Sequence, residues 1–361
     1  MAVPFTRLVS EALENYGQKE AYDNLRRHDG VIDAFGSNEA IKIEEGGRDN
    51  FVERTLYSQN TNVAARGKQD QITTIDDEGF TQVKSPQKIV DGSIVFNQIE
   101  LDQVAGNASL CPGLIEDKTD QFGTTWVQVI SDLLRQAVPT ANDPLTLLPS
   151  GTTGTVNGIL IARTPAQQGT DASTTLGISR GDNSWWRNQY SNTSYDLTQT
   201  AGRRGLYLDV YAPCVRGSGN GFEPNVGVCS TVVLASLGAA ADNNRRAMYS
   251  DASGKMRLGY DNIMFYNAQL IRDSSSRFLN GSAGKVAFLN TKALVIKVLK
   301  GQGKVTKEML TQRNNLGSLP IFWKHKAMSD IDTLNYISIG YINFNLVPKS
   351  LQDHGLADNC S

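Results

Sequence analysis

Few residues in this sequence have the types and spacing that chemistry requires. The segment Gly177-Ile-Ser-Arg-Gly matches the G-x-S-x-G motif that surrounds the nucleophilic serine of many hydrolases. That serine is reactive only on a sharp turn between a buried strand and a helix. Here the polar segment Asp171-Ala-Ser-Thr-Thr precedes the motif and Asp182-Asn-Ser-Trp-Trp follows it. The context therefore argues against a hydrolase.

The sequence also lacks a complete phosphate-binding loop and a metal-binding pattern. Gly281-Ser-Ala-Gly-Lys-Val and Gly301-Gln-Gly-Lys-Val carry Val where a phosphate-binding loop needs Ser or Thr. The three histidines, His28, His325 and His354, have no second His or Cys at metal-ligand spacing. The sequence thus predicts no enzymatic activity, no cofactor, and no catalytic, cofactor-binding or metal-binding residue.

Composition and charge argue against further classes of protein: nucleic-acid-binding, secreted and membrane proteins. Thirty-five Lys and Arg against 37 Asp and Glu give a net charge of −2 over 361 residues. A protein whose main function is to bind nucleic acid usually has a net positive charge. Four cysteines without a C-x-x-C pair are typical of reduced thiols in the cytosol. The apolar stretch 228–241 is too short and polar to cross a membrane, and the first residues lack a signal peptide. A soluble protein made inside a cell is the expectation.

The first predicted structural element is an amphipathic segment over residues 5–27. Its apolar residues recur at helical spacing, so they form one stripe that needs a surface to lie against. The members of this stripe are Phe5, Leu8, Val9, Ala12, Leu13 and Tyr16. Because a chain end frays unless it is docked, we expect the stripe to contact a neighbouring molecule or the subunit's own long helix.

Residues 41–100 predict a long β-hairpin. The outgoing arm contains 41–43 and 51–57, and the return contains 80–84, 88–90 and 93–101, with a polar tract between them. A long two-stranded hairpin is marginally stable alone in water. We therefore expect another molecule to cover part of it and expect it to be poorly ordered in an isolated monomer.

The remaining chain mixes helices and strands, which predicts an α+β fold. Apolar residues at steps of three and four from Phe122 to Ala137 predict a helix over Thr119–Val138, stopped by Pro139. A second helix is expected from Ser230 to about Met248. Segment 164–204 is polar, contains Trp185 and Trp186, and is expected to be a loop with some ordered surface structure. Strands are predicted at 206–211, 224–229, 262–271, 285–289, 293–299, 320–323 and 336–346.

This order of elements resembles the major capsid proteins of tailed bacteriophages, the Hong Kong 97-type fold. In that resemblance, residues 1–40 correspond to the N-terminal arm and 41–100 to the hairpin called the E-loop. Residues 101–163 and 326–361 correspond to the peripheral domain, with its spine helix near 119–138. Residues 164–325 correspond to the axial domain, with a possible insertion at 164–204. The segments Asn157-Gly-Ile-Leu, Pro224-Asn-Val-Gly-Val-Cys-Ser and Tyr336–Asn345 carry much of the likeness.

The resemblance implies a major capsid protein that self-assembles into hexamers and pentamers. These would form an icosahedral shell around double-stranded DNA, in a virion capsid assembled in the host cytoplasm. Implied partners are other copies of the chain, a separate scaffolding protein, a portal, a cement protein and non-specifically packaged DNA, with no membrane. An encapsulin-type compartment is the alternative from the same fold. A phage tail or sugar-binding protein that uses Trp185 and Trp186, or a soluble enzyme, is the alternative from other classes.

A shell subunit contacts several copies of itself, so exposed arms and hairpins are the expected contact regions. Apolar candidates lie in the N-terminal stripe and charged candidates in the hairpin. The predicted inter-subunit contacts are Phe5, Leu8, Val9, Leu13, Tyr16, Arg48, Asp49, Glu53, Arg54, Arg66, Lys68, Asp70, Lys84 and Lys88.

Overall fold

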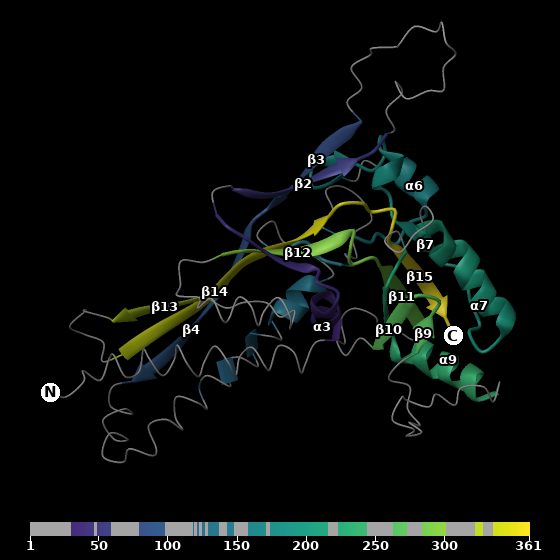
Figure 1. The fold of residues 1–361 in the computed structure, drawn as a ribbon. Helices are drawn as coiled ribbons and strands as arrows, with labels where there is room; N and C mark the ends of the chain where they lie inside the picture. The colour runs from purple at the N-terminus through teal and green to yellow at the C-terminus, as the bar shows by residue number, and fades with distance from the viewer. Residues whose placement is uncertain are drawn as a thin grey trace, which may run out of the picture.

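The computed structural model has an elongated shape built around two β-sheets (Figure 1). Its described residues are 30–46, 49–58, 79–97, 118, 121–122, 125–126, 129–136, 143–147, 158–170, 174–215, 223–243, 263–272, 284–300, 322–327 and 335–361. Every structural statement below refers to these residues. The predicted α+β class is confirmed, because helices and strands are both present and the strands gather into separate sheets.

The first sheet has five strands and is centred on the long strand β14. Its members are β1 (Ile41–Glu44), β4 (Lys88–Asn97), β12 (Leu294–Leu299), β13 (Phe322–Ala327) and β14 (Asn335–Pro348). β14 pairs antiparallel with β4, β12 and β13, and β1 joins β12 in parallel. Figure 1 shows β4, β13 and β14 as an extended ribbon at one end of the molecule.

A helix covers one face of this ribbon. Helical backbone is described at 118, 121–122, 125–126 and 129–134, which confirms most of the predicted long helix. Trp126, Ile130 and Leu134 are buried, as their spacing predicts. Gly92 of β4 lies against the ring of Phe122, where an added Cβ would stand 2.9 Å from that ring. A side chain at position 92 would therefore push the helix away from the sheet.

The bounds of this helix differ from the prediction. Lys118 is already helical, and the helix ends at Leu134 rather than near Val138. The Arg135 N–H bonds the Asp132 carbonyl, which tightens the last turn, and the Leu147 N–H bonds the Leu134 carbonyl at 2.8 Å. Orphan carbonyls at a helix end need such partners. A distant segment thus closes the helix before Pro139 is reached.

The second sheet has six strands in the order β7-β15-β11-β8-β10-β9. These strands are β7 (Gln189–Ser191), β8 (Val226–Cys229), β9 (Met264–Phe265), β10 (Ala268–Arg272), β11 (Gly284–Leu289) and β15 (Gly355–Cys360). The helix α9 (Thr231–Asn243) follows β8, in agreement with the predicted strand–helix unit. The hydroxyl of Ser230 accepts a bond from the Lys285 N–H. Three cysteines, Cys214, Cys229 and Cys360, are buried here as free thiols.

The strand predicted at 206–211 is wrong. That segment lies inside one continuous helical stretch, α7 (Thr200–Leu206), the π-helical turn η3 (Tyr207–Tyr211) and α8 (Ala212–Cys214). Leu206, Val210, Tyr211 and Cys214 are buried, and their spacing suits a helix that carries a π-bulge. A run of six mostly apolar and aromatic residues is too short to distinguish a strand from a helix.

Segment 164–204 contains the ordered structure that was predicted, but it is a packed unit with a buried centre and not only a surface loop. It contains α6 (Pro165–Gly169), the short hairpin of β5 (Thr174–Thr175) and β6 (Ile178–Ser179), and the 3-10 turn η2 (Ser184–Trp186). Fully buried Arg180 lies at its centre and donates hydrogen bonds to five oxygen acceptors of the unit and its surroundings. The acceptors are Thr175 Oγ1, Gln168 Oε1, Asn188 Oδ1, Gly158 O and Ile159 O.

The two sheets meet at a buried joint where the chain crosses between them twice. One crossing links β11 to β12 and the other links β14 to β15. His354 of the second crossing is fully buried, and its Nδ1 accepts a bond of 3.1 Å from the Asn290 N–H of the first. Burial lowers the pKa of His354 to about 3, against a weaker opposing effect of the Ser350 backbone. The imidazole is therefore neutral at neutral pH.

Acid is expected to destabilise this joint. The unfolded chain binds the proton near pH 6.5, whereas the folded chain resists it until about pH 3. The neutral His354 therefore contributes its full stabilisation above pH 6.5. The free energy of unfolding falls as the pH decreases from 6.5 towards 3, by about 1.4 kcal/mol per pH unit at most. Urea unfolding of the subunit at pH 7 and pH 5 measures this loss.

His354→Asn supplies the control for this measurement. The asparagine Oδ1 replaces the acceptor Nδ1 and does not titrate, so the variant should lose less stability over the same pH range. All other titratable groups are common to the two proteins, so the difference in pH dependence isolates His354. Identical pH dependence in the two proteins would contradict the assignment.

Candidate assembly surface

The hairpin that leaves the first sheet consists of β2 (Asn50–Leu56) and β3 (Phe80–Pro86). Seven residue pairs align antiparallel, from Asn50 opposite Pro86 to Leu56 opposite Phe80. The predicted hairpin over 41–100 included β1 and β4, but those strands pair with β12 and β14 instead. A strand pairs with whichever neighbour its hydrophobic face allows, which local sequence does not specify. The hairpin is therefore shorter than predicted, and its base is part of the sheet.

The inner face of the hairpin is anchored to its own subunit. Phe51 and Val83 are buried, and each contributes about 1.5–3 kcal/mol by leaving water. The Thr55 hydroxyl donates to the Lys349 carbonyl at 2.7 Å, and the Ser85 hydroxyl donates to the Leu346 carbonyl at 3.1 Å. One face of the hairpin thus needs no partner molecule.

A buried lysine strengthens this anchor. The side chain of Lys297 on β12 is only 3% exposed, and its Nζ forms ion pairs with Glu44 of β1 and Glu53 of β2, the latter at 2.9 Å. The same Nζ donates to the Val52 carbonyl at 3.1 Å. A buried ammonium needs such partners, because desolvating an unpaired charge is costly. Lys297 thereby ties three strands together.

The outer face of the hairpin is exposed. Leu56 and Phe80 stand opposite each other and are 75% and 57% exposed. Arg54 and Lys84 are exposed on the same face, since residues two apart along a strand share a side. This outer face (Arg54, Leu56, Phe80, Gln82 and Lys84) therefore combines an apolar pair with two cations. Such a surface suits a partner with apolar and acidic groups.

A second open surface lies on the ribbon of β4 and β14. The residues that point away from the long helix include Ile89, which is 65% exposed, and Val95, which is 43% exposed. On β14, Ile337, Ile339 and Tyr341 share this face and are half-buried, whereas Asn345 and Val347 further along are buried. Asn345 Nδ2 donates to the Pro86 carbonyl at the base of the hairpin, at 2.6 Å. The hairpin base thus covers one half of this sheet face and leaves the other half open.

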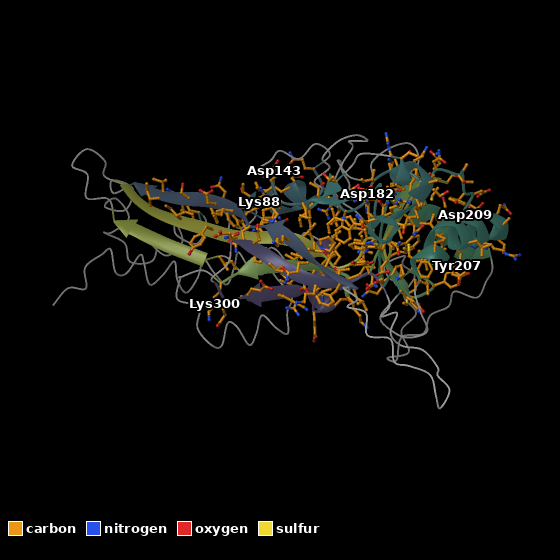
Figure 2. The ribbon with its side chains drawn as sticks, turned by 90° about the horizontal axis from the view of Figure 1, so that it is seen from above. Lys88, Asp143, Asp182, Tyr207, Asp209 and Lys300 are labelled. Atoms are coloured by element: carbon orange, nitrogen blue, oxygen red, sulfur yellow. The ribbon has the colours of Figure 1, made fainter. Side chains whose placement is uncertain are left out.

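The predicted contact residues fall in different environments. Asp49, Arg54 and Lys84 are exposed, and Lys88 is half-buried where β4 begins on the ribbon (Figure 2). Glu53 is engaged within its own subunit by Lys297. The other candidates lie outside the described residues: Phe5, Leu8, Val9, Leu13, Tyr16, Arg48, Arg66, Lys68 and Asp70.

Sequence reasoning missed three residues of this region. Leu56 and Phe80 end strands next to a polar tract, and nothing in their local pattern distinguishes a buried from an exposed position. Lys297 did carry a signal, because it stands alone in the apolar run Leu-Val-Ile-Lys-Val-Leu. A charge within a buried strand is nearly always paired. That run predicts a buried ion pair, but not the two glutamates that complete it.

The chemistry motifs have structural explanations. Ser179 lies on β6 after a two-residue turn in which Leu176 and Gly177 have φ of 55° and 79°. This is a hairpin and not the strand-to-helix turn of a hydrolase, in agreement with the prediction. Within the described ranges, His, Cys, Asp and Glu side chains form no group that could hold a metal ion. No helix described here is long and apolar enough to span a membrane.

Comparisons with known proteins identify the fold. No protein-family model matches the chain, and no curated protein matches it. The Cyanophage A-1(L) capsid asymmetric unit matches in structure with a TM-score of 0.56 and 15% identity, over 91% of this chain and 92% of that one.

Two further solved structures give weaker matches. The capsid of Myoviridae phage XM1 has a TM-score of 0.45 and 12% identity, over 89% of this chain and 90% of that one. The SrpI encapsulin complex from Synechococcus elongatus PCC 7942 has a TM-score of 0.45 and 10% identity, over 89% of this chain and 85% of that one.

The chain therefore has a phage capsid fold, and the match spans nearly the full length of both chains. The predicted resemblance to phage major capsid proteins is confirmed at the level of the fold.

Proposed function

We propose that this protein is the major capsid protein of a tailed phage and self-assembles into hexamers and pentamers of an icosahedral shell. The observation that carries the proposal is a capsid fold whose hairpin has one anchored face and one exposed apolar and basic face. A monomer gains nothing from holding Leu56 and Phe80 in water. A second copy that covers them would gain their burial.

The same proposal assigns the regions of the chain. Residues 1–40 act as the arm, the hairpin around β2 and β3 as the E-loop, and the helix that covers β4 and β14 as the spine. The helix α3 (Gly30–Ser37) modifies this division, because Val31, Ile32 and Phe35 are buried in the subunit's own core. The part of the arm available for neighbours therefore ends before residue 30. The protein's role is structural, with no catalytic step.

The content of the shell distinguishes a phage capsid from an encapsulin-type compartment. We infer that the virion shell encloses double-stranded DNA and assembles in the host cytoplasm, with a scaffolding protein, a portal and a cement protein as partners. Expression of the chain alone, followed by sedimentation and electron microscopy, tests assembly directly. Closed shells or isolated hexamers and pentamers support the proposal, and a chain that stays monomeric under all assembly conditions refutes it. Particles that enclose protein cargo instead of DNA would favour the encapsulin-type compartment.

The N-terminal stripe provides a prediction by truncation. Deleting residues 1–27 should leave a folded subunit, because the described residues from Val31 onward already form a continuous buried core. The same deletion should reduce closed shells at least tenfold. Several apolar side chains of about 1.5–3 kcal/mol each would be lost from every subunit contact. Circular dichroism checks folding and sedimentation checks assembly.

Two outcomes would contradict the role of the stripe. Normal shells from the truncated chain would make the segment dispensable. A truncated chain that fails to fold would place the segment in the subunit's own core.

A further inference from the structure

The tryptophan pair of segment 164–204, Trp185 and Trp186, has no role in the function proposed above. Trp186 is fully buried, and its Nε1 donates to the Thr175 carbonyl at 3.1 Å. Trp185 lies beside it with ring centroids 5.3 Å apart, and on its other side it contacts Tyr57. The Tyr57 and Trp185 rings are stacked, with centroids 5.5 Å apart and planes 18° apart. Through Trp185 the pair therefore contacts the hairpin of its own subunit.

The position of Tyr57 along the hairpin is informative. The last inner-face anchor on the outgoing strand is Thr55, bonded to Lys349. Tyr57 follows two residues later, and its N–H and that of Ser58 both bond the Gly79 carbonyl, at 2.9 and 3.2 Å. The stack thus holds the hairpin at the point where the strand pairing ends. Figure 1 shows β2 and β3 reaching the region of the molecule that contains α6.

The surface under Trp185 is held together by hydrogen bonds. The Trp185 Nε1 donates to Asn183 Oδ1 at 3.2 Å, and Asn183 Nδ2 donates to the Ser179 carbonyl at 3.0 Å. Arg187 bonds the carbonyls of Arg180 and Gly181 at 2.7 and 2.6 Å. Fully buried Arg180 then joins this layer to the segment at Gly158. A stack on such a hydrogen-bonded support should constrain the hairpin, because the support is tied to the rest of the subunit at several points.

We propose that the Tyr57–Trp185 stack is a clasp that fixes the direction in which the hairpin leaves its subunit, and thereby selects the geometry of the contact with a neighbouring copy. The anchors at Thr55, Ser85 and Lys297 fix where the hairpin leaves the sheet. The clasp adds a second fixed point further along, and two points define a direction. This inference rests on the proposed shell function, since the hairpin's direction matters only if its outer face meets another copy.

The test compares two substitutions of the same residue. Tyr57→Phe keeps the ring and should assemble as the wild type does. Tyr57→Ala removes the stack, and because Tyr57 is 43% exposed the subunit should stay folded. We expect Tyr57→Ala to give a broader distribution of particle diameters, with open sheets and shells of more than one size. Trp185→Ala should give the same distribution, and the double variant should be no worse than either single variant. Unchanged diameters in Tyr57→Ala would overturn the clasp.

A second measurement keeps the clasp testable if the shell proposal fails. An aromatic pair stabilises a contact enough to slow local opening on the order of two- to tenfold. Hydrogen exchange of the Tyr57 and Ser58 amides in the unassembled subunit should therefore be faster by that factor in Tyr57→Ala than in Tyr57→Phe. A wild-type chain that never assembles refutes the shell function alone. Equal exchange in the two variants refutes the clasp alone.

Discussion

Replacing Leu56 and Phe80 by aspartate is expected to abolish closed shells while the subunit stays folded. These side chains are 75% and 57% exposed, so their loss removes little from the subunit's own stability. Buried in a contact, the pair would contribute about 3–6 kcal/mol per copy, and each 1.4 kcal/mol is tenfold in affinity. The double variant should therefore sediment as free subunits or capsomers. Thermal unfolding followed by circular dichroism checks that it is folded.

The opposite face of the same hairpin provides the matched control. Phe51 is 1% exposed, so Phe51→Ala should destabilise the subunit by about 3–5 kcal/mol through lost burial and an unfilled cavity. Outer-face changes thus act on assembly and inner-face changes act on folding. Normal shell yield from the Leu56→Asp, Phe80→Asp variant would show that the outer face is not a contact between copies.

Replacing Lys297 by methionine is expected to lower the free energy of unfolding by about 2–3 kcal/mol. The change keeps the bulk of the side chain but leaves Glu44 and Glu53 without their shared cation. Removing one partner of a buried ion pair costs about 3–5 kcal/mol. The expected value is lower here because the two carboxylate side chains are 40% and 20% exposed and keep some water. Urea unfolding at neutral pH measures the effect.

Lys300, three residues further along the chain, is the matched control. Its Nζ pairs with Glu45 at 2.8 Å, but the two side chains are 37% and 83% exposed. Because exposed pairs contribute about 0–1 kcal/mol, Lys300→Met should change stability by no more than that. Equal effects of the two substitutions would mean that the Lys297 ion pairs do not anchor the hairpin.

Local periodicity predicted the long helix and the long strand β14. Trp126, Ile130 and Leu134 recur at helical spacing, and all three are buried against the sheet. The strand itself was predicted, but its burial differs from a simple alternation. Ile337, Ile339 and Tyr341 are half-buried, whereas Ile342 and Phe344 are buried on the opposite face. Both patterns involve residues close together in the chain. Both segments are also long enough that a single residue out of place does not obscure the periodicity. The order of such elements was also sufficient to indicate the capsid fold.

Periodicity failed where the pattern was short or mixed. The six residues from Leu206 to Tyr211 are mostly large and apolar, as in a strand, yet a π-helical turn buries Val210 and Tyr211 together. Segment 164–204 looked like a loop because polar residues dominate it. Its order comes from Arg180 and Asn188, whose side chains satisfy backbone carbonyls. Composition does not show which polar groups will find partners.

The sequence by itself determined the fold class, the helix on the ribbon and the absence of a recognisable catalytic motif. Only the tertiary structure decided that β1 and β4 join the sheet, that Glu53 pairs with Lys297, and that Trp185 stacks on Tyr57. These contacts join residues more than forty positions apart. Every strand carries the same backbone donors and acceptors, so strand partners depend on how all the apolar faces pack at once. That packing is a property of the whole chain and has no local signature.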